Sequence, residues 1–358
     1  MAKTFKPMLG DDVVTTRTLL HEAIPITGTI SSGTYNIGGT ATNVKTFSHG
    51  MFESVYDYAY LSSSANHIFD LTYGCSSNVS SSFNTQNAKK LNIYNQMAQV
   101  LFGYNISGNV RNFEADGTVD GTNVMNHCFF MNFSRLLTKD EIKKNTFRLN
   151  LFTSGTVITD GSGRDGLTLL GDYGSATEYR TCPAGDYGMI YTSSATPKPD
   201  GTSGVGLVFY QAGIVALTSS IFKSEFGPVG ENFIDQDPDE FDDGLCVHSA
   251  SVSGTIEQLS DGFRHVINDI DFNNTIELNS AIYFCRINHN EFNYSSNPTY
   301  VSGSKIVVKN NVSDLPLTYI TSVGLYSPDN ELMAVAKLSE PIRKDPNTEL
   351  TLRVRLDY

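Results

Sequence analysis

Hydrophobic and polar residues alternate in several stretches of this chain, a pattern typical of strands that bury one face. Residues 146–151 alternate strictly, and residues 351–358 do the same. The sequence therefore predicts a half-buried strand at each place. Because the chain ends on the second strand, we expect its edge to be available for pairing with another subunit. The second strand places Leu352, Val354, Leu356 and Tyr358 on one face and Thr351, Arg353, Arg355 and Asp357 on the other.

A hairpin is predicted near the C-terminus. Residues 318–326 and 331–338 are strand-like, and they flank the sequence Ser-Pro-Asp-Asn at 327–330. Proline sets the first central residue of such a turn, and Asp and Asn tolerate its strained backbone positions. Further upstream, the apolar stretch 205–217 predicts one central strand or a pair of strands.

Apolar residues recur at helical spacing in two longer segments. The first follows Asn84 or Thr85 and ends at Gly103; the second covers 253–270, where Thr255 and Gln258 form a capping box. Another capping box, formed by Thr138 and Glu141, predicts a short helix that begins at Thr138.

The elements together predict a mainly β fold with a few helices, of the α+β class. Glycine-rich turns at 161–163, 171–174 and 185–188 separate short strands, as in antiparallel β-sandwich or barrel units. We divide the chain into a mixed α/β region (1–145), a β-rich middle domain (146–250) and a C-terminal domain (251–358). The last is expected to be a helix packed on an antiparallel sheet.

The composition favours a surface that other subunits cover. Charged residues make up 18% of the 358 residues, below the usual quarter, and Ser, Thr, Asn and Gly carry the polarity instead. The formal net charge is −13 and Lys and Arg are not clustered, so we expect no nucleic-acid partner. No apolar run approaches 18 residues and no signal peptide is evident, so we expect no membrane contact and synthesis in the cytoplasm.

The sharpest candidate for a metal site is the acidic stretch 235–243, where Asp235, Asp237 and Asp239 stand at alternate positions. Hard cations such as calcium need several converging oxygens. An EF-hand loop is excluded, because its sixth position is Glu240 instead of Gly and its twelfth is Cys246 instead of Glu. An irregular calcium site and a solvated acidic loop are the two remaining interpretations.

Motifs for catalysis or cofactor binding are missing from the sequence. It contains no G-x-S-x-G, no phosphate-binding loop and no HExxH, and its five cysteines are widely scattered without CxxC spacing. A pair of catalytic carboxylates depends on tertiary structure and is open at this point. We expect no cofactor, no catalytic residues and no enzymatic activity.

Four C-terminal segments resemble virion structural proteins of tailed bacteriophages, mainly those of large or marine phages, including cyanophages. They are residues 291–300, 318–326, 330–338 and 353–358. The resemblance implies a tail-associated protein of the baseplate or neck, present in the virion and made in the host cytoplasm. Its implied partners are other virion tail proteins and further copies of itself in a symmetric assembly.

Three residues of the last strand are the candidates for subunit contact: Arg353, Arg355 and Tyr358. The two arginines give a basic stripe in an acidic protein, which suits an acidic neighbour. A solvated outer face is the alternative interpretation of that stripe. Two rival functions are a receptor-binding or fibre-tip protein, and a tail enzyme that degrades polysaccharide.

Overall fold

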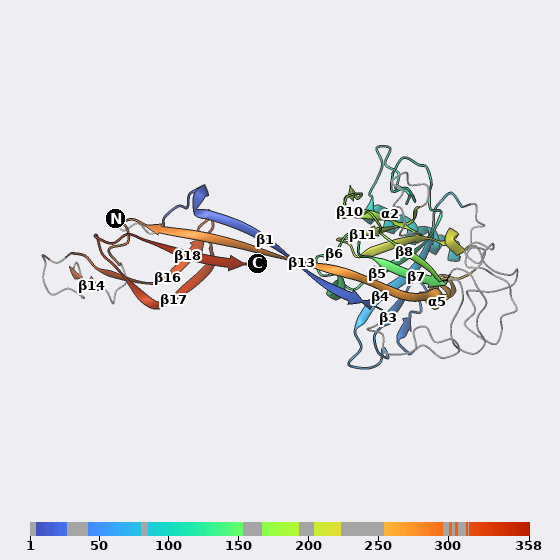
Figure 1. Ribbon diagram of the computed structural model, residues 1–358, viewed down its shortest axis with the longest axis horizontal. Coiled ribbons are helices and arrows are strands. Elements are labelled where there is room, and N and C mark those ends of the chain that lie inside the picture. Colours follow the sequence, from blue (N-terminus) through green and yellow to red (C-terminus); the bar gives the residue numbers. More distant parts are fainter. Residues whose placement is uncertain are drawn as a thin grey trace. The chain divides into compact units, whose positions relative to one another are not determined.

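The structure is a computed structural model that describes residues 5–26, 42–79, 85–152, 167–192, 204–222, 254–295, 301–302, 305–306, 313 and 315–358 (Figure 1). Among the described residues the fold is mainly β, with 48% strand and 14% helix, and a large antiparallel sheet contains most of the strands. The fold class predicted from alternating hydrophobicity is therefore confirmed.

The chain forms two compact units. Unit 1 consists of Met1–Leu19 and Glu277–Tyr358, and unit 2 is Leu20–Ile276. The unit boundaries fall inside strands β1 (Val13–Pro25) and β13 (Ile267–Ile287), whereas the sequence placed boundaries near residues 145 and 250. At residue 145 the chain stays within unit 2, because the backbone amide of Asn145 donates to the Asp172 carboxylate. Residue 250 lies outside the described residues.

Unit 2 contains a sheet with the strand order β13-β7-β8-β10-β11-β12-β5-β4-β3-β2. The alternating stretch at 146–151 forms β7, in which Leu149 and Leu151 are buried, and the apolar stretch at 205–217 forms a pair of strands. The strands are β2 (Val44–Thr46), β3 (Glu53–Tyr56), β4 (His67–Cys75), β5 (His127–Phe133), β6 (Glu141–Ile142), β7 (Arg148–Phe152), β8 (Leu167–Gly171), β9 (Arg180–Cys182), β10 (Gly185–Tyr191), β11 (Gly204–Phe209) and β12 (Ile214–Thr218).

Strand β5 is covered on both faces. Phe129 stacks on Phe263 of helix α5 (Ile256–Val266) with ring centroids 4.5 Å apart. The next residue, Phe130, points to the opposite face and lies 6.4 Å from Tyr94 of helix α2 (Thr85–Leu101). Consecutive side chains of a strand alternate between faces, so the two helices bury opposite sides of the sheet.

The two long helices agree with the sequence in position, with one correction in length. Gly103 ends α2 in a left-handed conformation (φ 72°) and bonds back to the carbonyl of Ala98. The capping box of α5 is present, with Gln258 N donating to Thr255 Oγ1 at 3.1 Å. The predicted helix 253–270 was too long, because residues from Ile267 onward pair with β7 and start β13. Helix α5 contacts β3 and β4 of unit 2.

The short helix predicted to begin at Thr138 was wrong. Helix α3 (Arg135–Thr138) ends there instead, and Lys139 takes a left-handed conformation with φ of 54°. Glu141 then starts β6, which pairs with β13. Pairing with a distant strand has outweighed a local capping signal. Two 3₁₀ turns, η1 (Gly10–Asp12) and η2 (Ser219–Phe222), complete the helical elements of the described residues.

Unit 1 is built almost entirely from strands. Strand β18 (Leu350–Asp357) pairs with the second half of β13, and the predicted hairpin is present as β16 (Thr318–Tyr326) and β17 (Leu332–Lys344) (Figure 1). Its turn is closed by a bond from the Asn330 amide to the Ser327 carbonyl. Two further short strands are β14 (Val301–Ser302) and β15 (Lys305–Ile306).

Candidate assembly surface

Unit 1 buries very few hydrophobic side chains. Of the buried hydrophobic residues in the part of the chain that the structure describes, only Ala281 belongs to unit 1, and the whole hydrophobic core cluster lies in unit 2. By contrast, 13 of the 24 exposed large hydrophobic residues belong to unit 1. Burial of apolar surface is the main force that stabilises a folded domain. Unit 1 therefore exposes the kind of surface that folded domains usually cover.

Five of the exposed hydrophobic residues of unit 1 lie on the β16–β17 hairpin, and we call the face that carries Tyr326 and Val335 its outer face; the five are Tyr319, Tyr326, Leu332, Met333 and Val335. The ring of Tyr326 lies over Gly324: a Cβ atom at Gly324 would be 2.9 Å from Tyr326 Cε2 and 3.3 Å from Leu332 Cδ1. Phe5 meets the same tyrosine edge to face, with ring centroids 4.9 Å apart. Across the hairpin, Val335 pairs with Gly324 and shares its face.

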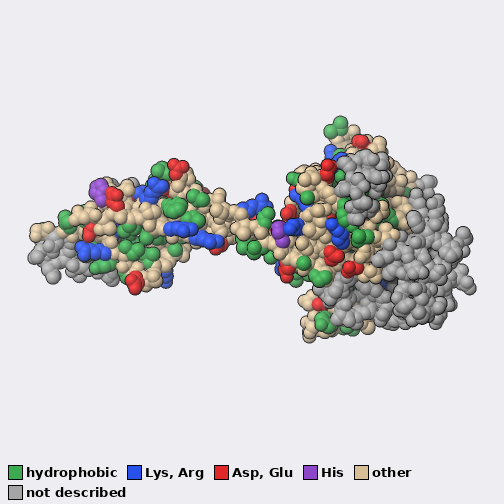
Figure 2. All heavy atoms as spheres, in the orientation of Figure 1, with side chains coloured by type: hydrophobic (Ala, Val, Ile, Leu, Met, Phe, Trp, Pro, Cys, Tyr) green, Lys and Arg blue, Asp and Glu red, His purple; other side chains and the backbone are tan. Residues whose placement is uncertain are grey.

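A β-bulge widens this hydrophobic surface. Leu325 pairs with Ala334 and Tyr326 with Leu332, so Met333 is an extra residue in β17. A bulge disturbs strict alternation, and the consecutive residues Leu332 and Met333 are both exposed, by 53% and 69%. We call the surface formed by Phe5, Tyr326, Leu332, Met333 and Val335 the hairpin patch. In Figure 2, hydrophobic and charged side chains are interspersed on the part of unit 1 that faces the viewer.

The hairpin patch has one signature in the sequence. The run from Leu332 to Ala336 is apolar at every position, whereas a strand with one solvated face alternates. A continuous apolar run is typical of a strand covered on both faces. In β17 the inner positions Ala334 and Ala336 are half-buried, and the outer positions Met333 and Val335 are exposed.

Of the three predicted contact residues, Arg353 and Arg355 lie on β18 and Tyr358 directly follows it, away from the hairpin patch in sequence. Arg353 lies opposite Phe284 of β13 and makes no ion pair with another described residue. Arg355 is already engaged: its Nε atom donates to Asp357 Oδ1 at 2.7 Å, and its terminal nitrogen lies 3.2 Å from Ser280 Oγ. Their role in subunit contact stays a prediction, and Arg353 is the freer of the two.

Tyr358 continues the last strand to its end. Its side chain is 69% exposed, while its backbone exchanges two hydrogen bonds with Asn279. Strand β18 pairs with β13 in a regular register over eight residues, and no other described strand pairs with it. Regular unpaired edges are the ones that accept a further strand.

Buried charged groups hold the irregular segments of unit 1 in place through hydrogen bonds and an ion pair, and no sequence pattern predicted these contacts. The Lys344 ammonium is fully buried and donates to His289 O, Asn293 Oδ1 and Asp345 O at 2.6 to 3.0 Å. Burial lowers the pKa of Lys344 from its ordinary value. Lys6 forms an ion pair with Glu291 at 2.5 Å. These contacts order unit 1 by polar bonds where hydrophobic packing is sparse.

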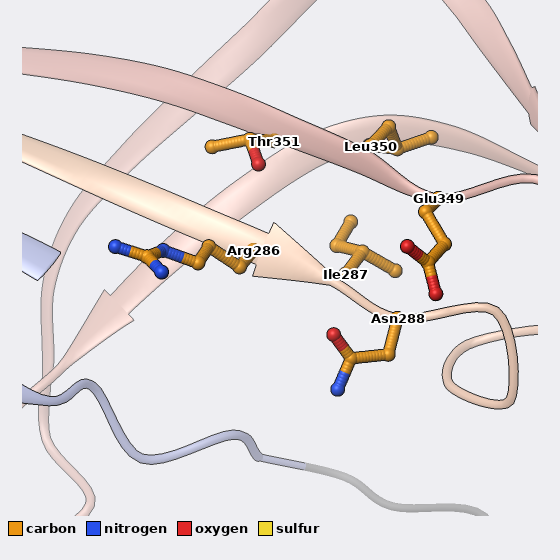
Figure 3. Close-up of a pocket in the computed structure, with 6 residues that line it drawn as sticks. All are labelled: Arg286, Ile287, Asn288, Glu349, Leu350 and Thr351. Carbon is orange, nitrogen blue, oxygen red and sulfur yellow. The ribbon is translucent and has the colours of Figure 1, made fainter.

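A shallow hollow of about 300 Å³ lies where β13 ends and β18 begins (Figure 3). Its charged side chains are already paired: Arg286 Nε lies 2.7 Å from Asp12 Oδ1, and His289 Nδ1 lies 3.1 Å from Glu349 Oε1. Both charged side chains that line the hollow, Arg286 and Glu349, therefore already have a side-chain partner. The residues that line it are Arg286, Ile287, Asn288, Glu349, Leu350 and Thr351.

Asp172 is the centre of a buried polar network in unit 2. Its Oδ2 atom accepts from the Asn145 amide at 2.7 Å and from the Ser175 and Tyr210 hydroxyls at 2.8 and 3.0 Å. Arg148 donates to Oδ1 at 3.1 Å. Burial raises the pKa of Asp172 to about 6, although these hydrogen bonds favour the charged form. The network ties together distant segments and has no exposed face at the carboxylate.

The calcium candidates Asp235, Asp237 and Asp239 lie outside the described residues. Within the described ranges, no three His, Cys, Asp or Glu side chains come close enough together to hold a metal ion. In a second acidic loop, at 114–121, the carboxylate of Glu114 has partners within the loop: it accepts hydrogen bonds from the backbone amides of Asp120 and Gly121 at 3.0 and 2.9 Å. Among the helices of the described residues, none combines the length and apolar character needed to cross a bilayer.

Comparison with known proteins identifies no relative. No protein-family model, no curated protein and no solved structure matches this chain.

Proposed function

We propose that this chain is a structural component of a tailed-phage virion, associated with the tail or neck, and that it acts through contacts between subunits. The observation that carries the proposal is the exposed hydrophobic surface of unit 1, which has one buried hydrophobic residue of its own in the described part of the chain. A unit of this kind gains stability when another subunit covers it.

The resemblance to virion proteins also points to unit 1 as the part of the chain that contacts other subunits. All four segments that carry it, 291–300, 318–326, 330–338 and 353–358, fall within unit 1. The segments that resemble virion proteins and the hairpin patch therefore lie in the same unit, as expected if neighbouring subunits in a virion cover that unit.

The charge distribution also suits assembly through unit 1. Unit 1 contains eleven Lys and Arg and eleven Asp and Glu, so its formal charge is zero. Unit 2 contains the remaining 14 basic and 27 acidic residues and carries the whole net charge of −13. Net neutrality favours association, and excess charge of one sign keeps surfaces apart and soluble.

The test is to look for the chain in purified particles of the phage that encodes it. Mass spectrometry is expected to detect the chain at several copies per particle, and antibodies against unit 2 are expected to label the tail or neck in electron micrographs. Absence of the chain from particles that contain all known tail proteins would refute the proposal. Labelling confined to a fibre tip, with binding of the purified chain to host cells, would favour the receptor-binding alternative instead.

A further inference from the structure

We infer that the hairpin patch is the surface on which a second copy of this chain docks. The two hairpins lie face to face with their long axes antiparallel, so that the turn of each hairpin lies opposite the Lys337 end of the other. This inference rests on the proposed function and deepens it by naming the surface and the partner. It is carried by the size of the patch, by its place on one face of the hairpin and by the charges at its two ends.

The patch has the area that such a contact needs. Its five side chains are 47% to 69% exposed. With ~200 Å² for a large side chain, the exposed part amounts to on the order of 500 Å² of mainly apolar surface. A standard interface buries roughly 800 Å² per partner, of which about 60% is apolar. The patch therefore supplies the apolar centre of one standard interface.

The geometry of a two-stranded ribbon suits docking against an identical ribbon. The outer face of the hairpin is formed by Gly324, Tyr326, Leu332, Met333 and Val335, and the missing side chain at Gly324 leaves room for the Tyr326 ring and the Leu332 side chain beside it. Sheets pack face to face through such apolar surfaces. A second hairpin in the same conformation provides the layer that is missing from the outer face.

The charges beside the patch favour a second copy over an unrelated partner. Asp329 and Glu331 are exposed at the turn end, and Lys337 is exposed beyond Val335 at the other end. None of these three side chains makes an ion pair or a side-chain hydrogen bond with another described residue. When two copies dock with their hairpin axes antiparallel, the acidic turn of each hairpin faces Lys337 of the other. The two-fold symmetry of the pair forms this contact twice. The neutral formal charge of unit 1 adds no net repulsion between copies.

The first test is sedimentation velocity of the full chain over a concentration series. Replacing Leu332 and Met333 together by Asp is expected to raise the dissociation constant of the self-associated form at least about tenfold, because two apolar contacts are lost on each copy. The matched control is Leu61→Asp in unit 2, where the side chain is 86% exposed; it is expected to leave self-association unchanged. All three positions are exposed, and far-UV circular dichroism checks that the fold is retained.

The second test is charge reversal. Lys337→Glu and Glu331→Lys are each expected to weaken self-association about three- to tenfold, because each places like charges opposite one another. The two changes in one chain restore opposite charges and are expected to return the dissociation constant to within about threefold of the original. Failure of the combined variant to recover would overturn the antiparallel arrangement.

The results separate this inference from the proposed function. If the full chain is monomeric at all concentrations, or if it self-associates equally well with Leu332 and Met333 replaced, the inference fails. The proposed function is then still judged by the presence of the chain in virions. If the chain self-associates through the hairpin patch but is absent from virions, the inference holds and the proposed function fails.

Discussion

The Tyr210 hydroxyl donates a hydrogen bond to Asp172 Oδ2 at 3.0 Å, and both side chains are fully buried in unit 2. The two residues are 38 positions apart in the sequence. Asp172 directly follows β8 and Tyr210 directly follows β11, so the hydrogen bond links the ends of these two strands. Burial and the neighbouring Asp172 carboxylate together raise the pKa of Tyr210 above its ordinary value, and the hydroxyl stays the donor.

Removing this donor is expected to destabilise unit 2. Tyr210→Phe keeps the ring and leaves the Asp172 carboxylate with one hydrogen bond fewer, so we expect the free energy of unfolding to fall by about 1–3 kcal/mol. Urea unfolding followed by far-UV circular dichroism measures this change. Tyr319→Phe, at an exposed tyrosine of unit 1, is the control and is expected to have no measurable effect. Equal stability of Tyr210→Phe and the parent chain would contradict the role of the bond.

Asp172 is also expected to make stability depend on pH. Its pKa in the folded chain, about 6, lies above the ordinary 3.8, so folding favours the protonated form. The contribution is complete below about pH 4 and is lost as the pH rises through 6, so Asp172 stabilises the chain more at pH 5 than at pH 7.5.

The variant Asp172→Asn isolates this contribution, because it removes the titrating group and keeps the shape. The difference in unfolding free energy between the parent chain and Asp172→Asn is expected to shift by about 1–1.5 kcal/mol in favour of the parent between pH 7.5 and pH 5. Urea unfolding at both pH values measures it. A constant difference would show that the carboxyl titrates at its ordinary pKa.

Helix α2 approaches β4 so closely that only glycine is accommodated at Gly74. A Cβ atom there would lie 2.8 Å from the Tyr94 backbone nitrogen and 3.1 Å from the Lys90 carbonyl oxygen. Backbone atoms of a helix cannot rotate away, so we expect Gly74→Ala to lower the unfolding free energy by about 1–3 kcal/mol. Gly10→Ala is the control, since a Cβ atom at Gly10 meets no atom within 4 Å. A neutral effect at Gly74 would mean that the helix shifts freely on the sheet.

The capping box of α5 gives a separate test of local structure. Thr255 Oγ1 accepts from the Gln258 amide, and Gln258 Oε1 accepts in return from the Thr255 amide at 2.9 Å. Thr255→Ala is expected to cost about 1 kcal/mol of unfolding free energy, because it leaves an amide of the first turn unsatisfied. Thr255→Ser keeps the hydroxyl and is expected to retain most of the stability. If Ala and Ser behave alike, the cap does not contribute.

The sequence by itself determined those features that neighbouring residues decide. The turn at 327–330, the stop at Gly103 and the cap at Thr255 each depend on residues at most about five positions apart, and the alternation in 351–358 follows from the two-residue period of a strand.

Only the tertiary structure decided which of these elements meet. The local capping signal failed at Thr138 because Glu141 pairs with β13 as part of β6, and helical spacing continued falsely past Val266 because the residues from Ile267 onward pair with β7. The burial of Lys344 and Asp172 depends on groups 27 to 55 positions away, and no local pattern encodes such contacts. The hairpin patch is exposed for the same reason: an apolar residue is buried only when a distant segment covers it, and in unit 1 no described segment covers Leu332, Met333 or Val335.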